Sequence, residues 1–190
     1  KQIAVVEEVG KRVGDKMDLM LDPFCAYKTF GDTIKVGRAC DEWGYYWYED
    51  PFKDGGVSAF AHRKLREIIK TPLLQLEHTR GLEPHMDFII ADGTDFVRID
   101  QDYDGGITGV MKIAHASEGL GLDVVSGGEL AIARAVDFPP QAVYFHGNNK
   151  SQDELEMALG YGIGRVVVDN FHELDLLSKI SSRMGVTQDI

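Results

Sequence analysis

Three carboxylates recur along the chain at nearly equal intervals. Asp22, Glu49 and Glu77 are separated by 27 and 28 residues, and each one ends a short apolar run. One strand, one helix and two loops need about that many residues, so the spacing indicates a repeated strand–helix unit. Because the carboxyl ends of neighbouring parallel strands lie side by side, we expect the three acids to converge as an oxygen-rich cation site. Capping of the next helix would explain any one of them alone, and their common register favours the metal site.

Apolar runs typical of strands alternate with helical patterns along the whole chain. A helical pattern over residues 2–14 comes first, and later helices are predicted from Ser58 to Lys70 and after Ser151, whose capping box is completed by Glu154. The predicted strands are residues 19–22, 46–49, 73–77, 96–100, 122–126, 142–146, 165–169 and 186–190.

This alternation predicts an α/β fold with a parallel sheet. We expect a single (β/α)8 TIM-barrel-like domain over residues 1–190, which starts with a helix and ends with a short eighth strand. The eighth run is weak and half polar. The alternatives are an open seven-stranded parallel sheet and a barrel completed by another copy of the chain, because an unpaired strand edge favours association.

Composition excludes several classes of function. The net charge is −11 and the basic residues are scattered, so we expect no nucleic-acid partner. No apolar run is long enough to cross a bilayer, so no membrane partner is expected either. Cys25 and Cys40 are too few for a disulfide framework and are expected to be reduced thiols, which is typical of a cytoplasmic protein.

Residues 1–124 resemble the barrel domain of the enolase superfamily, in its mandelate racemase-like, acid-sugar dehydratase branch. The resemblance lies in the runs Leu-Met-Leu-Asp-Pro ending at Pro23, Tyr-Glu-Asp-Pro ending at Pro51, Leu-Glu-His-Thr-Arg-Gly ending at Gly81 and Arg-Ile-Asp ending at Asp100. It implies that Asp22, Glu49 and Glu77 are Mg²⁺ ligands and that Asp100 belongs to a catalytic His-Asp dyad.

Residues 121–190 resemble a different family, diaminopimelate decarboxylase, a pyridoxal phosphate (PLP) enzyme whose catalytic domain is also a barrel. The matching runs are residues 122–130, 144–151 and 166–170. We therefore interpret residues 121–124 as the junction (seam) between the two resemblances. The chain is interpreted as a chimera of two barrels, made by engineering or by selection from fragments.

Neither parental chemistry is complete in this sequence. No His follows Asp100 at the end of the next predicted strand, and no Lys-x-Lys pair occurs anywhere. The resemblance also implies that the Schiff-base lysine of the decarboxylases lies before the inherited piece. PLP is therefore not expected, and Lys150 is predicted to be a solvated charge in a loop.

We therefore expect a chimeric barrel without efficient native catalysis that retains a Mg²⁺ site. The first alternative is a residual Mg²⁺-dependent lyase or racemase that acts on sugar acids, with Asp100 or His78 as a substitute base. The second alternative is a homo-oligomer whose barrel is completed by another copy.

Overall fold

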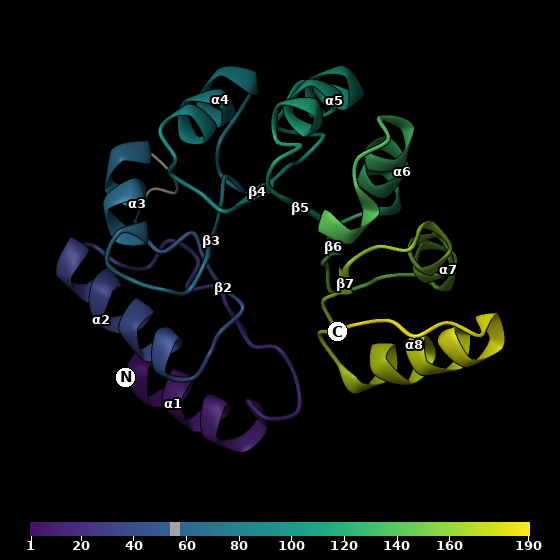
Figure 1. Ribbon diagram of the computed structural model, residues 1–190, viewed down its shortest axis with the longest axis horizontal. Helices are drawn as coiled ribbons and strands as arrows, with labels where there is room; N and C mark the ends of the chain where they lie inside the picture. The colour runs from purple at the N-terminus through teal and green to yellow at the C-terminus, as the bar shows by residue number, and fades with distance from the viewer. Residues whose placement is uncertain (54–57) are drawn as a thin grey trace. The chain divides into compact units, whose positions relative to one another are not determined.

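The computed structural model describes residues 1–53 and 58–190, and the chain divides into two compact units. The first unit comprises Lys1–Arg98 and the second Ile99–Ile190. Both units repeat the same order of strand and helix, and every strand pair within a unit is parallel (Figure 1). This is the architecture of (β/α)-barrel proteins, so the predicted parallel α/β fold class is confirmed.

The first unit contains four strands and four helices among its described residues. The strands are β1 (Met20–Leu21), β2 (Trp47–Glu49), β3 (Leu73–Gln75) and β4 (Phe96–Arg98). The helices are α1 (Gln2–Val13), α2 (Phe30–Glu42), α3 (Ala59–Arg66) and α4 (Leu82–Ile90). The predicted opening helix is thus confirmed.

The strand register explains why the acids fall at one edge of the unit 1 sheet. Leu21 pairs with Tyr48 and Tyr48 pairs with Leu73, so the three strands run together and end together. Asp22 therefore lies one residue beyond a paired position, level with Glu49. Strands β2 and β3 are buried on both faces, as expected for a parallel sheet covered by helices.

Helix α1 packs against α2 through a close backbone approach. A Cβ added at Gly10 would lie 2.5 Å from Cγ of Trp43, so no larger residue fits there without displacing the indole. The Tyr45 hydroxyl donates a hydrogen bond of 3.2 Å to the carbonyl oxygen of Val6, which also ties α1 to the start of β2. The opening helix is therefore an integral part of the unit 1 core.

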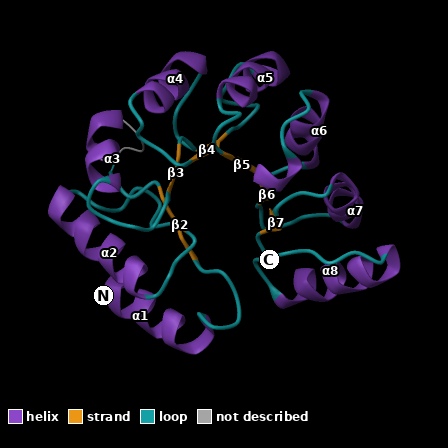
Figure 2. Cartoon of the chain, in the orientation of Figure 1, coloured by secondary structure: helices purple, strands orange, loops and turns teal. Residues whose placement is uncertain are grey.

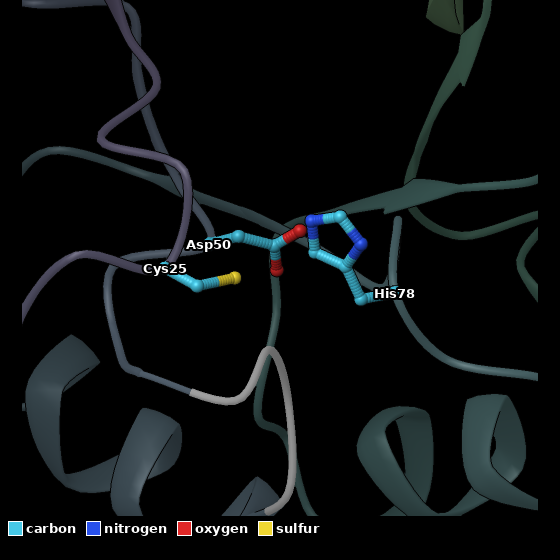
Figure 3. Close-up of side chains that lie close together, drawn as sticks. All are labelled: Cys25, Asp50 and His78. Atoms are coloured by element: carbon cyan, nitrogen blue, oxygen red, sulfur yellow. The ribbon is translucent and has the colours of Figure 1, made fainter.

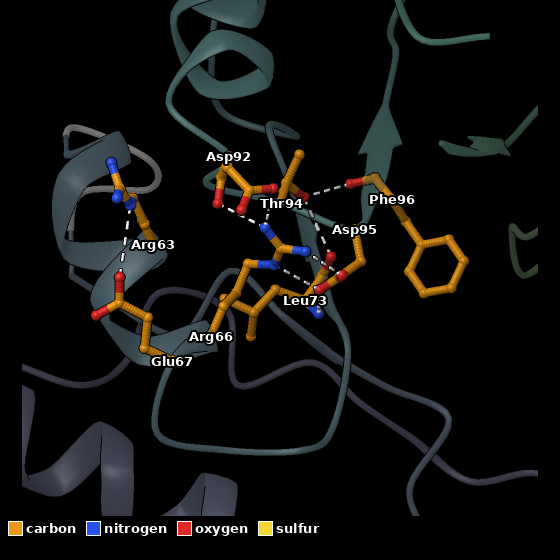
Figure 4. A network of polar contacts seen from close by, with 8 residues as sticks. All are labelled: Arg63, Arg66, Glu67, Leu73, Asp92, Thr94, Asp95 and Phe96. Carbon is orange, nitrogen blue, oxygen red and sulfur yellow. Dashed lines mark hydrogen bonds and ion pairs between the residues drawn. The ribbon is translucent and has the colours of Figure 1, made fainter. Parts of the chain in front are cut away.

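A polar network around Arg66 joins α3 to the segment before β4 (Figure 4). The guanidinium donates to both carboxylate oxygens of Asp95, at 3.0 and 2.6 Å, and also to the side chain of Asp92. Asp95 in turn accepts from the backbone N–H of Leu73 at 2.8 Å. One arginine thus links α3, β3 and the loop before β4 by a bidentate, charge-assisted contact.

The second unit continues the pattern with three strands. These are β5 (Gly121–Val124), β6 (Val143–Phe145) and β7 (Arg165–Val166), and the helices are α5 (Gly106–Ala116), α6 (Gly127–Ala135), η1 (Pro140–Ala142), α7 (Gln152–Tyr161) and α8 (Phe171–Met184). The predicted capping box of α7 is confirmed, since Ser151 and Glu154 each bond the other's backbone N–H. The Glu154 carboxylate also accepts from the N–H of Gly127 at 2.8 Å, so it caps two helices.

The predicted eighth strand is wrong. Residues 186–190 form no strand, and Figure 2 draws the segment after α8 as a loop. One backbone hydrogen bond of 3.1 Å runs from Val166 N to Asp189 O, and the Gln188 side chain donates to the Ile163 carbonyl at 3.3 Å. The segment is thus held beside β7 by one backbone hydrogen bond and by the Gln188 side chain, not by a strand ladder. The helix predicted to extend to Lys70 also ends earlier, at Arg66.

Candidate metal site

The three predicted ligands of the first unit lie together at the carboxyl ends of its strands. One carboxylate oxygen from each of Asp22, Glu49 and Glu77 lies within 4.8 Å of the others. Asp22 directly follows β1, Glu49 is the last residue of β2, and Glu77 follows β3 by two residues. We call these three residues the carboxylate cluster. The predicted convergence is therefore confirmed, whereas the binding of a metal stays a prediction.

Burial changes steeply across the carboxylate cluster. Glu49 is only 1% exposed, Glu77 is half-buried and Asp22 is exposed. Two carboxylates about 5 Å apart repel by roughly 3 kcal/mol at an effective dielectric of 20, and less where one of them is in water. The three acids thus concentrate negative charge at the carboxyl ends of the strands, and this charge is stabilised only if positive charge lies nearby.

Arg98, the last residue of β4, supplies part of that positive charge. Its Nη1 donates to Oε1 of Glu49 at 2.7 Å, and its Nη2 lies 3.5 Å from Oε1 of Glu77. The Arg98 side chain is 12% exposed, so both contacts are largely shielded from water. No local pattern predicted this partner, because Arg98 lies 49 residues after Glu49.

Left-handed backbone conformations concentrate beside the carboxylate cluster. Four of the non-glycine residues with positive φ flank its ligands: Phe24 (52°), Cys25 (55°), Asp50 (25°) and Leu76 (97°). Such conformations cost free energy in residues with a Cβ and are retained where the surrounding structure enforces them. At Leu76 the chain leaves the extended path of β3 just before Glu77, which redirects that ligand.

The two predicted catalytic residues have different surroundings. His78 is half-buried, and its Nε2 lies 3.7 Å from Oε2 of Glu77. The ring of Phe24 meets it edge-on, with the centroids 5.1 Å apart. Asp100 belongs to the second unit, where its carboxylate accepts from the N–H of Asp102 at 2.8 Å. Within the first unit, the structure therefore places His78 beside the carboxylate cluster.

A second cluster beside the first was missed by the sequence analysis. Cys25, Asp50 and His78 each offer one donor atom within 4.8 Å of the other two (Figure 3). We call them the thiol cluster. Its members follow the three acids in the sequence by three, one and one residues, so the strand repeat that predicted the acids could also have predicted this set.

Asp50 is the buried centre of the thiol cluster. It is 1% exposed, and its Oδ1 accepts from the N–H of Leu76 at 3.3 Å. Burial raises the pKa of Asp50 to about 6, which the hydrogen bond from Leu76 and the nearby His78 imidazole partly oppose. Figure 3 shows its carboxylate between the Cys25 sulfur and the His78 ring.

Lys150 is not the solvated charge that the sequence predicted. Its side chain is 1% exposed, and Nζ lies 2.8 Å from Oε1 of Glu173. It also donates to the carbonyl oxygens of Gly147 and, at 2.8 Å, Val167. The ammonium therefore joins the loop before α7 to β7 and α8 as a buried ion pair. The partner Glu173 lies 23 residues further along the chain, beyond any local sequence signal.

A comparison with models of known protein families identifies the family of this chain. A family model described as enolase C-terminal domain-like matches residues 1–169, which is most of the 190 residues. The chain therefore belongs to the enolase C-terminal domain-like family. The family match extends beyond residues 121–124, where the sequence motifs change from those of the enolase superfamily to those of diaminopimelate decarboxylase.

Solved structures of this family resemble the chain in fold. L-Talarate dehydratase from Polaromonas sp. JS666, complexed with Mg and L-glucarate, is 26% identical with a TM-score of 0.67, over 82% of this chain and 42% of that one. A mandelate racemase/muconate lactonizing enzyme from the same organism is 26% identical with a TM-score of 0.68, over 78% and 40%. D-Glucarate dehydratase from Agrobacterium tumefaciens, complexed with magnesium, shows the same fold at 23% identity and a TM-score of 0.66, over 79% and 38%.

The second resemblance, to diaminopimelate decarboxylase, is also found in a comparison with curated proteins. Diaminopimelate decarboxylase from Bacillus methanolicus is 60% identical over 73 residues, which is 38% of this chain and 17% of that protein. The enzyme from Halalkalibacterium halodurans is 38% identical over 138 residues, or 72% of this chain and 31% of that protein. The chain thus spans less than a third of these relatives. Together with the family match, they are consistent with a chain that combines the two families.

The helices were also compared with what a bilayer requires. Among the described residues, no helix has both the length and the apolar character needed to span a membrane.

Proposed function

We propose that this chain is an enolase-family protein that binds a hard divalent cation, Mg²⁺ or Mn²⁺, at the carboxylate cluster. We further propose that the cation binds the carboxylate of a small hydroxy acid of the sugar-acid class. The observation that carries the proposal is the convergence of oxygens from Asp22, Glu49 and Glu77 within 4.8 Å. Three carboxylates suit a cation that prefers oxygen ligands and keeps several waters.

The ligands must move slightly closer to hold Mg²⁺. Bonds of about 2.0–2.1 Å in an octahedron place neighbouring oxygens ~3 Å apart. Asp22 and Glu77 lie in loops just beyond their strands and have room to adjust, whereas Glu49 is fixed in β2. The similar solved structure of L-talarate dehydratase, which carries Mg and L-glucarate, supports this assignment.

Each residue has a distinct role in the proposed site. Glu49 provides a rigid, buried ligand whose second contact, Arg98, fixes its orientation. Asp22, exposed at the rim, provides the ligand nearest to solvent. A bound cation supplies the positive charge that a substrate carboxylate needs. Arg98 lowers the net charge of the cluster from −3 to −2 and limits the repulsion between acids without metal.

We propose that the chain by itself has no efficient turnover. The resemblance to the enolase superfamily implies two elements that take the α-proton, a Lys-x-Lys pair and a His partner for Asp100. Neither occurs at the corresponding places of this sequence. A general base contributes about 10²–10⁴-fold to rate. We attribute the gap to a chimeric origin, in which decarboxylase-type sequence from residue 121 onward replaces the enolase-type strand that carries the His.

The cation site is tested by thermal melts at neutral pH with and without millimolar Mg²⁺ or Mn²⁺. A cation at 100 times its Kd stabilises the folded chain by about 2.7 kcal/mol, which raises Tm by roughly 5–10 °C at this chain length. The shift should vanish in Glu49→Gln and persist in Glu67→Gln, a control on an exposed face of the same unit. A wild-type melt that does not change with either cation would exclude the site.

A residual lyase is the second candidate function, and the position of His78 favours it. Its Nε2, 3.7 Å from Glu77, puts a base at the edge of the carboxylate cluster. The sensitive assay is exchange of deuterium into the carbon next to the carboxylate of sugar acids, in the presence of Mg²⁺. Exchange that is abolished by both Glu49→Gln and His78→Gln would establish this activity. Exchange at the background rate would exclude it.

A further inference from the structure

A second set of potential ligands differs in chemistry from the carboxylate cluster. Cys25, Asp50 and His78 offer one sulfur, one oxygen and one nitrogen donor within 4.8 Å of each other (Figure 3). Sulfur and imidazole favour borderline and soft cations such as Zn²⁺ and Co²⁺ over Mg²⁺. Three protein ligands that leave one tetrahedral position open are typical of catalytic rather than structural zinc sites.

The buried carboxylate of Asp50 is the independent sign of a ligand. Its Oδ2 is buried and has no hydrogen-bond partner among the described residues, although the residue is 99% buried. A buried polar atom without a partner costs roughly 1–3 kcal/mol. A cation held between the sulfur and the imidazole would satisfy that oxygen, and Figure 3 shows the carboxylate directed into this space with a ring nitrogen of His78 turned toward it.

The backbone holds the three side chains near each other. The N–H of Cys25 donates to the carbonyl oxygen of Asp50 at 2.9 Å, which ties the loop after β1 to the loop after β2. The N–H of Leu76 donates to Asp50 Oδ1 and ties the loop after β3 to the same residue. Phe24 packs against His78 and restricts rotation of its ring. The thiol cluster is thus set by the same three loops that carry the carboxylate cluster.

We propose that Cys25, Asp50 and His78 form a site for a borderline divalent cation, Zn²⁺ or Co²⁺, distinct from the Mg²⁺ site beside it. Zinc bonds of about 2.0–2.3 Å place tetrahedral ligands ~3.5 Å apart, so the donors close by about 1 Å on binding. Two of the three side chains lie in loops and are half-buried, which permits that movement. Glu49 and Asp50 are consecutive, so neighbouring carboxylates serve a hard site and a softer one.

The test is a titration of reduced, untagged full-length chain with Co²⁺ in an excess of Mg²⁺. We expect one Co²⁺ per chain, a near-ultraviolet band from thiolate-to-cobalt charge transfer, and displacement of the band by Zn²⁺. Excess Mg²⁺ should leave the band unchanged. A band that Mg²⁺ abolishes, or no band at all, would overturn the proposal.

Matched variants assign the ligands. Cys25→Ser should abolish the band, and Cys40→Ser should retain it, because Cys40 is fully buried and burial raises the pKa of its thiol to about 12. Asp50→Asn and His78→Gln should weaken Co²⁺ binding by about tenfold or more. Glu49→Gln should keep the cobalt band while losing the Mg²⁺-dependent rise in Tm, which separates this proposal from the proposed function.

A measurement on the unmodified chain covers the case in which a variant does not fold. Zn²⁺ should slow alkylation of Cys25 by iodoacetamide, measured by mass spectrometry of peptides, while Mg²⁺ at the same concentration should not. Equal alkylation of Cys25 with and without Zn²⁺ would contradict the site. A cobalt band that survives in folded Cys25→Ser would do the same.

Discussion

At the scale of single residues, Arg98 balances the carboxylate cluster. Its guanidinium bonds Glu49, which is 1% exposed, at 2.7 Å. Removing one partner of a buried ion pair leaves an uncompensated charge and typically costs about 3–5 kcal/mol. Arg98 also neutralises charge that a bound cation would neutralise, so a cation at the proposed site would act partly in place of Arg98.

We therefore predict that Arg98→Met lowers the free energy of unfolding by about 3–5 kcal/mol without metal and that Mg²⁺ restores part of the loss. The rise in Tm on adding Mg²⁺ should be larger in the variant than in the wild type. Urea unfolding with and without Mg²⁺ measures both effects. Arg63→Met is the control, because the Arg63–Glu67 pair is exposed and should cost less than about 1 kcal/mol. Equal losses in the two variants would contradict the role of Arg98.

His62 makes the stability of the chain depend on pH. Its ring packs against Phe52 and Phe88, with centroids 4.8 and 5.1 Å away, and Nδ1 lies 2.8 Å from the Ser58 carbonyl oxygen. Burial lowers the pKa of His62 from 6.5 to about 4. Below pH 6.5 the unfolded chain gains a proton here that the folded chain does not accept until about pH 4.

The free energy of unfolding should therefore fall as the pH drops from 6.5 toward 4, by up to about 3 kcal/mol from this residue. His62→Gln should flatten that part of the pH profile, measured by urea unfolding at a series of pH values. His115→Gln, whose parent side chain is 54% exposed, should leave the slope unchanged. The slope of the free energy of unfolding against pH is compared, not its absolute value, because loss of the ring packing lowers the stability of His62→Gln at every pH. Parallel wild-type and His62→Gln profiles would exclude this origin.

The same residues show what could be predicted from sequence. The convergence of the carboxylate cluster followed from strand spacing alone, because parallel strands place equivalent positions side by side. Cys25 and Asp50 were missed although the same strand repeat carries them, because each residue considered alone has an ordinary explanation. Arg98 was missed because its partner Glu49 lies on another strand, 49 residues earlier. Lys150 was wrongly predicted to be exposed, since its burial depends on Glu173 in α8. Partners distant in the sequence leave no local signal.

At the scale of elements, helix α7 is defined by its first turn. Ser151 accepts from the N–H of Glu154, and Glu154 accepts from Ser151 and from Gly127 at the start of α6. The Glu154 carboxylate is partly buried, which would raise its pKa. The hydrogen bonds from Ser151 and Gly127 outweigh that effect, so the pKa is lowered.

Ser151→Ala should lower the free energy of unfolding by about 0.5–2 kcal/mol, the usual contribution of an N-cap side chain. Thermal and urea unfolding would measure it. Ser182→Ala, in the exposed last turn of α8, is the control and should be neutral or slightly stabilising, since alanine is the better helix former. A Ser151→Ala chain as stable as the control would exclude a contribution from the cap.

Helix starts were easier to predict from sequence than strand ends. Ser151 was predicted as a cap and Ser58 as the start of a helix, and both side chains accept from the backbone N–H of the third helical residue. The final strand was predicted wrongly because only Val186 and Ile190 in this run are apolar, and Gln188 between them bonds Ile163 through its side chain. Propensity identifies a segment able to pair, but only tertiary contacts decide whether it does.

At the scale of the molecule, all three members of the carboxylate cluster belong to the first unit, Lys1–Arg98. Binding of Mg²⁺ should therefore slow local amide exchange in the segments after β1, β2 and β3. At short labelling times, amides of Ile99–Ile190 should exchange at unchanged rates. Hydrogen exchange followed by mass spectrometry measures this, with Glu49→Gln as the control that shows no Mg²⁺ effect. Equal slowing throughout the chain would place the cation elsewhere.

Association with another copy stays a prediction. In the described part of the first unit, β1 pairs with β2 and no second strand borders it within that unit. Unpaired strand edges favour association, so we expect the mean mass from light scattering to rise with protein concentration. A mass equal to one chain over the whole accessible range of concentration would contradict this.

Glu49 and Asp50 are neighbours in sequence, so one peptide bond separates the two donor sets. Side chains alternate in direction along an extended segment, and a shift by one position exchanges their environments. Deletion of one codon in β2 would therefore move Asp50 into the position of Glu49 and Pro51 into that of Asp50, so the thiol cluster would lose its carboxylate. It would also shift Trp47 and Tyr48, which are 1% and 0% exposed, by one position within the core. During evolution, β2 should therefore change by substitution and not by insertion or deletion. Both the packing of its side chains and the order of the proposed cation ligands depend on its length.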